Sequence, residues 1–440
     1  MGLFKVRKIL AILSAILIST QSWAVSLIND TETERLLTNL IKPLAYAAEI
    51  PDGRLDIHII NEDDFNAFVA GGEDVYVYTG LLKRIKNPNA LQAVIAHEMG
   101  HMIGGHTAQM SQRMDAEMKR TMLIQALGVG LMVAGGNPSL GAGVLAGSSG
   151  IARQSMMAFT RDEERIADDL GVNLMTKANL NPNGFVTVFE QMQEITGAIE
   201  AKINPNQINH PLTTERLNNV QDKIKSTKKT YNTDKKITEK QNQEYELVRA
   251  KLIGYLDTPT HVREIYPNTD KSDAALYARA ISNMRVGNLD GALMGVQTLI
   301  SRQPQNPYFY ELMGDIKYQQ GYYDDSVDAY QQSLTLVPNA PQIQTALALV
   351  LTERNKTSDK TQAIELCKRA LLKEPAPLTY WVLARAYGDN DAGRRDWAMA
   401  EYYKMLNKNK DAKKFAKNAQ KKLKKSDAEY LKAEDILKLK

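Results

Sequence analysis

Two histidines, His97 and His101, lie four residues apart with Glu98 between them, in a segment whose apolar residues recur with a helical period. On a helix, residues four apart differ by about 40° in direction, so both imidazoles point to one side. Two imidazoles so placed can bind one zinc ion, and Glu98 can act as general base toward a water that the ion activates. The pattern also arises by chance, so it indicates a zinc hydrolase only together with its surroundings.

A catalytic zinc ion needs a third protein ligand and an open position. His106 is one candidate, but its spacing is one residue short of the pattern in which a chain turn brings a third histidine to the metal. If the helix continues, His106 points about 180° away from His97. We therefore expect His106 to be a polar residue at the helix end.

The other candidate ligand lies in the helical segment FTRDEERIAD, residues 159–168. Glu164 and Asp168 are one turn apart on one face, so Glu164 can bind the metal while Asp168 accepts a hydrogen bond from a ligating imidazole. Glu163 competes for the ligand role, and acidic helix faces are commonly only solvated. The pairing with Asp168 favours Glu164, and the small Ala167 allows close helix packing beside it.

Short strands and helices must position these groups. Residues 27–54 have a helical pattern, and a long helix that carries the two histidines is expected to begin near Asn87. Residues 55–60 and 67–78 have strand patterns, the second as a hairpin that turns at two glycines. We expect residues 75–78 to form an edge strand to which an extended substrate can add.

The N-terminus has the pattern of an export signal. Three basic residues precede the apolar run 9–18, which is too short to cross a bilayer as a mature helix, and a Ser-Trp-Ala sequence ends at Ala24. We expect a signal peptide cleaved after Ala24, in preference to an uncleaved anchor, and a periplasmic protein. Cys367 is the only cysteine and is expected to be a packed core residue, so the chain has no internal disulfide.

Residues 121–152 contain no charged side chain. Eight glycines and a proline interrupt the segment, and no run reaches the roughly 18 apolar residues that a membrane span requires. A buried helix followed by a glycine-rich loop is favoured over a membrane segment. Such a loop near an active site is a candidate lid.

The second half of the chain is repetitive. Small residues and prolines recur after 34 residues, as at Gly287 and Gly321, and later copies follow as far as about Tyr403. This is the period of tetratricopeptide repeats, in which two helices per repeat pack through small residues. We therefore expect a mainly α protein, an α+β protease domain with a small sheet followed by an α-solenoid. The expected divisions are a signal peptide, a protease domain, a linker, the repeats and a Lys-rich tail, at 1–24, 25–221, 222–243, 244–410 and 411–440.

The formal net charge of +4 comes from 55 basic and 51 acidic residues, a balance that argues against nucleic acid as a partner. The distribution is uneven, because residues 1–24 carry +3, residues 408–440 carry +7 and the remainder carries −6. A solvated helix face is the simplest account of the Lys-rich end. Peripheral contact with anionic lipid is a weaker alternative.

Four motifs occur together: HEMGH at 97–101, FTRDEERIAD at 159–168, NAF at 66–68 leading into VYVYTGLL at 75–82, and NHPL at 209–212 followed by Arg216. As a set they resemble the zinc metallopeptidase family of the CAAX prenyl proteases, HtpX and the Oma proteases. The resemblance covers about residues 25–220. Thr160 stands where the family commonly has Ser, which is a conservative difference.

The resemblance implies that His97, His101 and Glu164 bind one Zn²⁺ and that Glu98 is the general base. Asp168 matches an aspartate often described as a proton donor, although the helix geometry suits a hydrogen bond to a ligand imidazole better. His210 is implied to stabilise the oxyanion or to occupy the fourth metal position as a latch. Taken by itself, a lone loop histidine is more commonly an exposed turn residue.

Arg216 is a candidate partner for the substrate carbonyl or oxyanion. With an export signal and C-terminal repeats, the resemblance implies a protease that degrades misfolded or stalled outer-membrane proteins and aids their assembly. The repeats would contact the outer-membrane assembly machinery. The alternative is a chaperone or scaffold that acts through its repeats and keeps a latent protease site.

Overall fold

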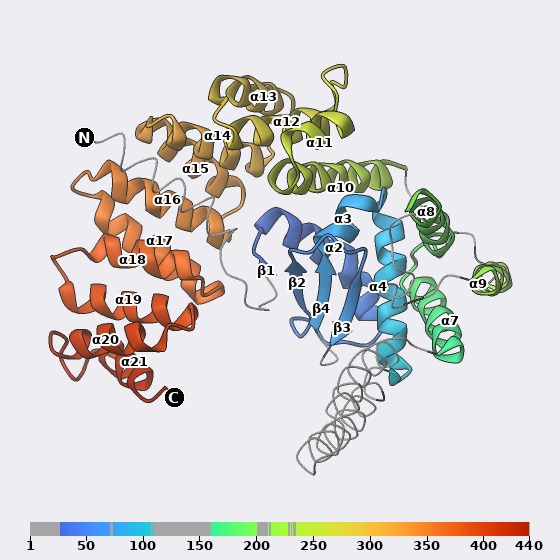
Figure 1. Ribbon diagram of the computed structural model, residues 1–440, viewed down its shortest axis with the longest axis horizontal. Helices are drawn as coiled ribbons and strands as arrows, with labels where there is room; N and C mark the ends of the chain where they lie inside the picture. The colour runs from blue at the N-terminus through green and yellow to red at the C-terminus, as the bar shows by residue number, and fades with distance from the viewer. Residues whose placement is uncertain are drawn as a thin grey trace, which may run out of the picture.

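The computed structural model describes residues 27–70, 74–106, 109, 160–199, 210, 213–227, 229, 231 and 235–439. The signal peptide, the glycine turn and the segment 121–152 expected from the sequence lie outside these residues. One half of the molecule contains a small sheet with helices packed on it, and the other half is a curved array of helix pairs (Figure 1). Among the described residues, no helix combines the length and the apolar character that crossing a bilayer requires.

The sheet has four strands in the order β1-β2-β4-β3. Their bounds are Leu27–Ile28 for β1, Asp56–Ile60 for β2, Ala67–Ala70 for β3 and Asp74–Tyr78 for β4. Strand β4 pairs with β2 in parallel and with β3 in antiparallel fashion, so the predicted strands and hairpin are present. The prediction that residues 75–78 form an edge strand is wrong, because both sides of β4 are hydrogen-bonded. The edge strands of the described sheet are β1 and β3.

Six helices accompany the sheet in the described part of this half. Their bounds are Thr31–Ala47 for α2, Thr79–Arg84 for α3, Pro88–Ile103 for α4, Arg161–Lys177 for α7, Gly184–Ile199 for α8 and Thr214–Ser226 for α9. Helix α4 begins as the sequence predicts, because the Asn87 side chain accepts a hydrogen bond from the amide of Ala90 and Pro88 occupies the first turn. The first predicted helix is too long at both ends, since Leu27 and Ile28 pair with β2 and α2 ends at Ala47.

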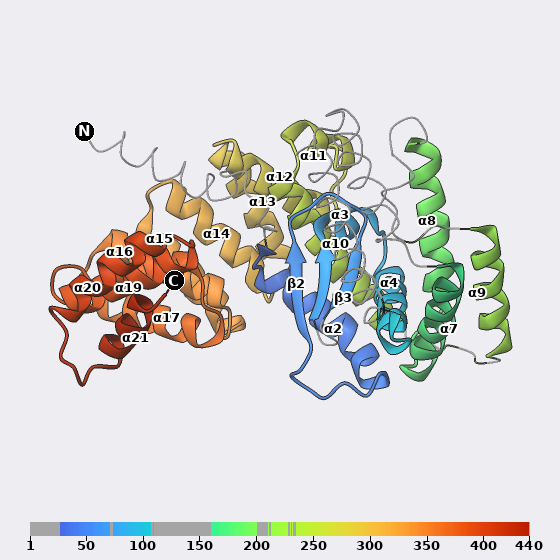
Figure 2. The ribbon, with the colours of Figure 1, turned by 60° about the horizontal axis from the view of Figure 1, so that its bottom comes forward.

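The second half consists of antiparallel helix pairs that follow one another along a solenoid (Figures 1 and 2). The bounds are Lys235–Leu256 for α10, Pro259–Ile265 for α11, Asp273–Arg285 for α12, Leu289–Arg302 for α13, Pro307–Gln319 for α14, Tyr323–Leu336 for α15, Pro341–Arg354 for α16, Asp359–Lys373 for α17, Pro377–Tyr387 for α18, Ala392–Met405 for α19, Asn409–Gln420 for α20 and Ala428–Leu437 for α21. The repeat positions Gly287 and Gly321 have φ angles of +80° and +79°. Each therefore makes the left-handed turn between two helices of a pair, which explains the period of 34 residues.

The segments expected to be a linker and a tail both contain helix. Helix α9 extends to Ser226 and α10 begins at Lys235, while the Lys-rich C-terminal segment forms α20 and α21. These two helices bury five apolar side chains against the last repeats: Ala412, Ala416, Ala419, Ala433 and Ile436. Cys367 is buried in the same core, as the sequence predicts. The domain boundaries themselves stay predictions.

Candidate metal centre

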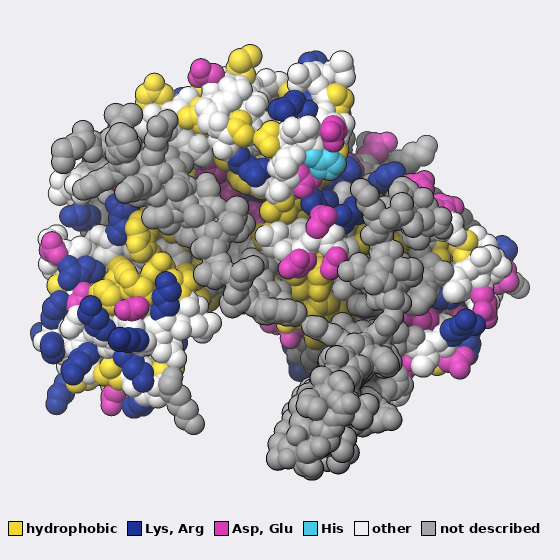
Figure 3. Space-filling model, viewed as in Figure 1, with side chains coloured by type: hydrophobic (Ala, Val, Ile, Leu, Met, Phe, Trp, Pro, Cys, Tyr) yellow, Lys and Arg dark blue, Asp and Glu magenta, His cyan; other side chains and the backbone are white. Residues whose placement is uncertain are grey.

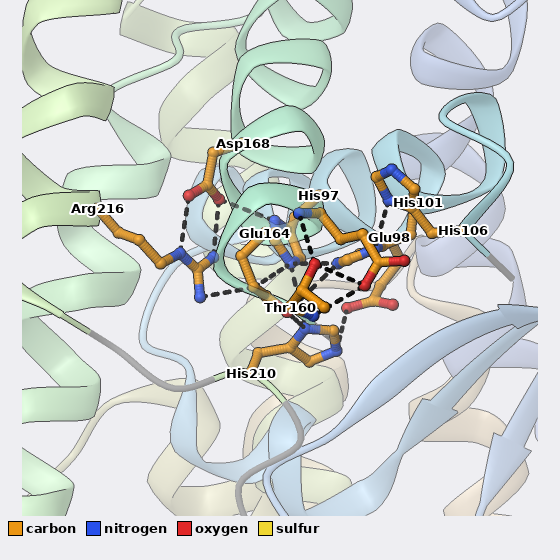
Figure 4. A network of polar contacts seen from close by, with 10 residues as sticks. His97, Glu98, His101, His106, Thr160, Glu164, Asp168, His210 and Arg216 are labelled. Carbon is orange, nitrogen blue, oxygen red and sulfur yellow. Dashed lines mark hydrogen bonds and ion pairs between the residues drawn. The ribbon is translucent and has the colours of Figure 1, made fainter. Parts of the chain in front are cut away.

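Three elements bring the chemically active side chains together. Helix α4 carries His97, Glu98 and His101, and α7 carries Glu164 and Asp168. His210 lies shortly before α9, on which Arg216 is placed. Figure 4 shows these side chains directed toward one another from the three elements, and all of them except His210 are buried.

Glycine allows α4 and α7 to approach closely. A Cβ atom on Gly100, inside the histidine motif, would lie 2.4 Å from the carbonyl oxygen of Ala167. A Cβ atom on Gly171 would lie 3.0 Å from the carbonyl oxygen of Ala96. The close packing expected at Ala167 is therefore present, and it brings the first turn of α7 beside the two histidines.

Four side chains converge on one point. His97, His101, Glu164 and His210 each offer a donor atom, and these atoms all lie within 4.8 Å of one another. The Nε2 atoms of His97 and His101 are 3.2 Å apart, and Nε2 of His97 is 3.4 Å from both Oε2 of Glu164 and Nδ1 of His210. Zinc–ligand bonds of roughly 2.0–2.1 Å place tetrahedral donors about 3.3–3.4 Å apart. The donor set therefore fits a tetrahedral metal ion.

The charge of the site also fits a divalent cation. Glu98, Glu164 and Asp168 are 5%, 2% and 3% exposed, and the guanidinium of Arg216 is the positive group among them. The three carboxylates and the guanidinium together carry a net charge of −2, and neutral imidazoles add nothing to it. Burial lowers the pKa of His97, but hydrogen bonds to Asp168 and Glu164 outweigh it and raise this pKa to about 10. The site thus attracts positive charge, which a divalent metal ion can supply.

The pKa values of His101 and Glu164 are both lowered, which leaves His101 neutral and Glu164 anionic. Burial and the neighbouring His97 lower the pKa of His101 to about 2, so its imidazole is neutral, as a metal ligand must be. Burial acts to raise the pKa of Glu164, but hydrogen bonds from His210 and His97 reverse this and hold it below its ordinary value. Glu164 is therefore an anionic donor.

Asp168 and Arg216 lie behind the donor atoms. Oδ1 of Asp168 is 2.9 Å from Nδ1 of His97, on the side of the ring away from the other donors. Nε and Nη2 of Arg216 donate to the two oxygens of Asp168, each at 2.8 Å, and Nη1 lies 2.7 Å from Glu164. Burial opposes ionisation of Asp168, but these partners lower its pKa. Asp168 thus lies in close contact with the His97 ring, on the side where the helix spacing predicts it.

His106 has a position that the sequence predicts only in part. Helix α4 ends at Ile103, and Gly105, with a φ angle of +73°, turns the chain so that His106 packs back onto the helix. Its side chain is buried and stays outside the four-donor group, but its Nδ1 is 3.0 Å from Nδ1 of His101. The only local feature of the sequence that points to this contact is the Gly104-Gly105 pair, which permits the turn. His106 can fix the orientation of the His101 ring.

Glu98 lies at the open side of the site. Burial raises its pKa, and its Oε1 is 3.4 Å from Nε2 of His210. A cavity of about 70 Å³ adjoins Glu98 and His97, and apolar side chains of β3 and α8 line part of it, among them Ala67, Phe185 and Phe189. A buried carboxyl group with a raised pKa beside a cavity is suited to accept and return a proton.

Glu163, the alternative candidate for the metal ligand, instead caps the first turn of α7. The Thr160 side chain accepts a hydrogen bond from the Glu163 amide at 3.2 Å, and the Glu163 carboxylate accepts one from the Thr160 amide at 2.8 Å. This reciprocal capping box begins α7 and fixes the turn that contains Glu164. The hydroxyl that Thr160 shares with Ser is the group that the cap uses.

Comparison with known proteins adds the family. Residues 31–224 match Peptidase family M48, and residues 314–353 match a TPR repeat. The Beta-barrel assembly-enhancing protease of Escherichia coli (strain K12) is 24% identical over 329 residues, which are 73% of this chain and 65% of that protein. The chain thus spans just under two thirds of the length of that relative.

Two further relatives match shorter stretches of the chain. Metalloprotease YcaL of Escherichia coli (strain K12) is 31% identical over 166 residues, 38% of this chain and 60% of that protein. Mitochondrial metalloendopeptidase OMA1 of Schizosaccharomyces pombe is 26% identical over 193 residues, 43% of this chain and 52% of that protein.

Proposed function

Residues 31–224 belong to peptidase family M48, a metallopeptidase family, and from that premise we propose that the chain is a zinc-dependent endopeptidase for unfolded or stalled proteins. The observation that supports zinc is the convergence of three imidazoles and one carboxylate at tetrahedral spacing. Nitrogen and oxygen donors of this kind, in a buried tetrahedral set, suit zinc.

His97, His101 and Glu164 hold the metal in this proposal. When bound, zinc lowers the pKa of a water molecule and polarises the scissile carbonyl. Glu98 accepts a proton from the attacking water and returns it to the leaving nitrogen. Asp168 holds the His97 ring, and Arg216 balances the charge of Glu164 and Asp168. A contact of Arg216 with the substrate carbonyl stays a prediction.

The decisive experiment compares the wild type with Glu98→Gln. We expect about one zinc per chain in both proteins. Glu98→Gln should cleave an unfolded protein such as casein at least about 10³-fold more slowly, because the general base is gone while the ligands remain. Equal cleavage by the two proteins, or a wild type that binds no zinc, would refute the proposal.

The edge strand β3 supports a preference for extended chains. Its residue Ala67 lines the cavity beside His97 and Glu98, so a substrate strand that pairs with β3 reaches the site. Backbone pairing depends little on the side-chain sequence, and a compact folded protein offers fewer extended, unpaired segments than an unfolded chain does. We therefore infer broad cleavage of unfolded proteins, with compact folded proteins cleaved far more slowly.

His210 is proposed as a latch. Its Nδ1 lies 2.7 Å from Oε1 of Glu164, within the donor group, where it occupies the place that an incoming water or substrate requires. Removing the ring in His210→Ala should raise casein cleavage several-fold without loss of zinc. The opposite outcome, lower cleavage with zinc retained, would favour oxyanion stabilisation instead. Unchanged cleavage would exclude both roles.

The cellular role is proposed from the relatives and the repeats. The name of the Escherichia coli relative refers to β-barrel assembly, and repeats of this type commonly bind proteins. We propose a periplasmic enzyme that removes stalled outer-membrane proteins and meets their assembly machinery through the solenoid. A scaffold with a latent site is the alternative, and a cell that keeps full function with Glu98→Gln would favour it.

A further inference from the structure

The last full helix pair of the solenoid presents a face made of lysine. Lysines recur along α20 at spacings of three and four residues, and we define the Lys face as Lys410, Lys413, Lys414 and Lys417. At 100° per residue these four lie within an arc of about 100°. The opposite side of α20 is apolar and fully buried in the solenoid core, through Ala412, Ala416 and Ala419. The helix is therefore held in place by its apolar side, and its charged side is directed outward.

The Lys face has no partner within the molecule as far as the structure describes it. No ion pair joins its lysines to a described residue, whereas the nearby Lys422 pairs with Asp396 at 2.5 Å. Lys421, Lys424 and Lys425 continue the exposed charge into the turn before α21. Figure 3 shows lysine and arginine side chains gathered over this end of the molecule. The unneutralised charge is thus a property of the surface, available to a ligand.

The type and distribution of the charge favour a membrane over other polyanions. Residues 408–440 contain 12 lysines and no arginine, and arginine is the residue that recognises single phosphate groups by paired hydrogen bonds. Lysines on the outer side of a helix line no groove and alternate with no exposed aromatic residues, as a nucleic-acid site would require. A row of point charges on a convex surface matches a plane of many anionic headgroups.

We propose that the Lys face docks the protein on an anionic lipid surface. The charge of the rest of the chain supports one orientation, since residues 25–407 carry −6 while residues 408–440 carry +7. An anionic membrane attracts the C-terminal end and repels the remainder. Helices α20 and α21 lie at one end of the long axis, and α7 to α9 lie at the other (Figures 1 and 2). Docking therefore leaves the metal centre away from the lipid, where it can receive chains that approach the membrane.

The test uses the chain beginning at Val25, which keeps every described residue, and vesicles of phosphatidylcholine with or without phosphatidylglycerol. We expect sedimentation with the anionic vesicles only, and its loss at high ionic strength. The variant Lys410→Gln/Lys413→Gln/Lys414→Gln/Lys417→Gln should partition at least about 100-fold more weakly. It should keep its helical circular dichroism and its casein cleavage, because these side chains face solvent.

The matched control removes four exposed lysines from the other parts of the chain, at positions 42, 86, 177 and 271, and has the same net charge. It should bind anionic vesicles like the wild type. Equal loss in the two variants would show that only net charge matters and would overturn the proposal. It would also be overturned if the wild type bound neutral and anionic vesicles alike, or bound polyglutamate or DNA but no vesicles.

Discussion

Among the buried charged groups that the structure describes, two clusters differ in how their atoms are arranged. In the metal centre, donor atoms of His97, His101, Glu164 and His210 converge on one point. In the junction between the two halves, the ammonium of Lys251 on α10 is itself the centre. It lies beside Asp30, Glu32 and Glu311, at 2.5, 3.3 and 3.4 Å. We call these residues, with Tyr277 and Asp315, the Lys251 cluster.

This difference distinguishes a ligand-binding site, the metal centre, from a structural contact between the two halves, the Lys251 cluster. In the metal centre the donor atoms of four side chains face one another, an arrangement that a bound metal ion would complete. The Lys251 cluster contains its cation and joins α2 of the protease half to α10 and α14, and the Tyr277 hydroxyl donates to Glu32 at 2.9 Å. We therefore expect changes in the first cluster to alter activity and changes in the second to alter stability.

The largest effect on stability should come from Lys251→Met. The variant keeps roughly the length of the side chain but leaves the buried Glu32 and the half-buried Asp30 and Glu311 without their cation. Breaking a buried ion pair in this way costs about 3–5 kcal/mol. Urea unfolding should show the loss, and hydrogen exchange should show faster opening of α2 and α10. Zinc content and casein cleavage should stay normal at temperatures where the variant is folded.

Glu98→Gln is the control with the opposite expected result. It should lose casein cleavage, while its urea midpoint stays equal to that of the wild type or rises. A second variant, Lys251→Met/Asp30→Asn, should recover part of the lost stability, since one uncompensated carboxylate is removed. The distinction between the two clusters would be wrong if Lys251→Met lost zinc as readily as His101→Ala. It would also be wrong if Lys251→Met unfolded at the wild-type urea concentration.

A smaller effect is expected from pH, with opposite sign in the two clusters. Burial outweighs the attraction of Lys251 and raises the pKa of Glu32 to about 7 and that of Glu311 to about 8. The ordinary value is 4.5, so between pH 4.5 and 8 the folded chain binds more protons than the unfolded chain. The free energy of unfolding therefore falls as pH rises through this window. Metal binding changes the other way, because its histidines must lose protons.

Other titratable groups face Glu32 and Glu311, so the control variant must change only these two carboxyl groups. Asp315 also has a pKa raised by burial, whereas Asp30 has one lowered by Lys251 in spite of its burial. The variant Glu32→Gln/Glu311→Gln removes two of the titrations in the window, while Glu34, whose pKa burial also raises to about 7, remains. With zinc saturating, its urea midpoint should depend less on pH between 5 and 8 than that of the wild type. Identical pH profiles would show that these carboxylates do not titrate there.

The sequence predicts the metal centre far better than the Lys251 cluster, and the reason is physical. Helix period alone places His97 beside His101 and Glu164 beside Asp168, so each pair is visible within five residues. Lys251 meets Asp30 and Glu311 across 221 and 60 positions of sequence, and no local pattern signals such a contact. The Arg216 contact with Asp168 was missed for the same reason.

The fold shows the same division. The helix starts and the 34-residue repeat were predictable, because caps and turns such as Asn87 and Gly321 are local. The strand order was not, because pairing is decided by packing between distant segments, and β4 proved to be internal. The position of His106 is intermediate in predictability, because the chain turns back onto α4 through a single left-handed residue, Gly105.

The smallest effect concerns the helix caps of the two clusters. Thr160 caps α7 one turn before Glu164, and Asp30 caps α2 while it also pairs with Lys251. Thr160→Ala should lower the free energy of unfolding by about 1 kcal/mol, the usual loss for an N-cap, whereas Thr160→Ser should stay near the wild type. Because fraying of the first turn displaces Glu164, Thr160→Ala should also weaken zinc binding, measured by competition with a chelator. Asp30→Asn keeps an acceptor at the cap and should leave zinc affinity unchanged, so equal zinc loss in both variants would contradict the separation of the two clusters.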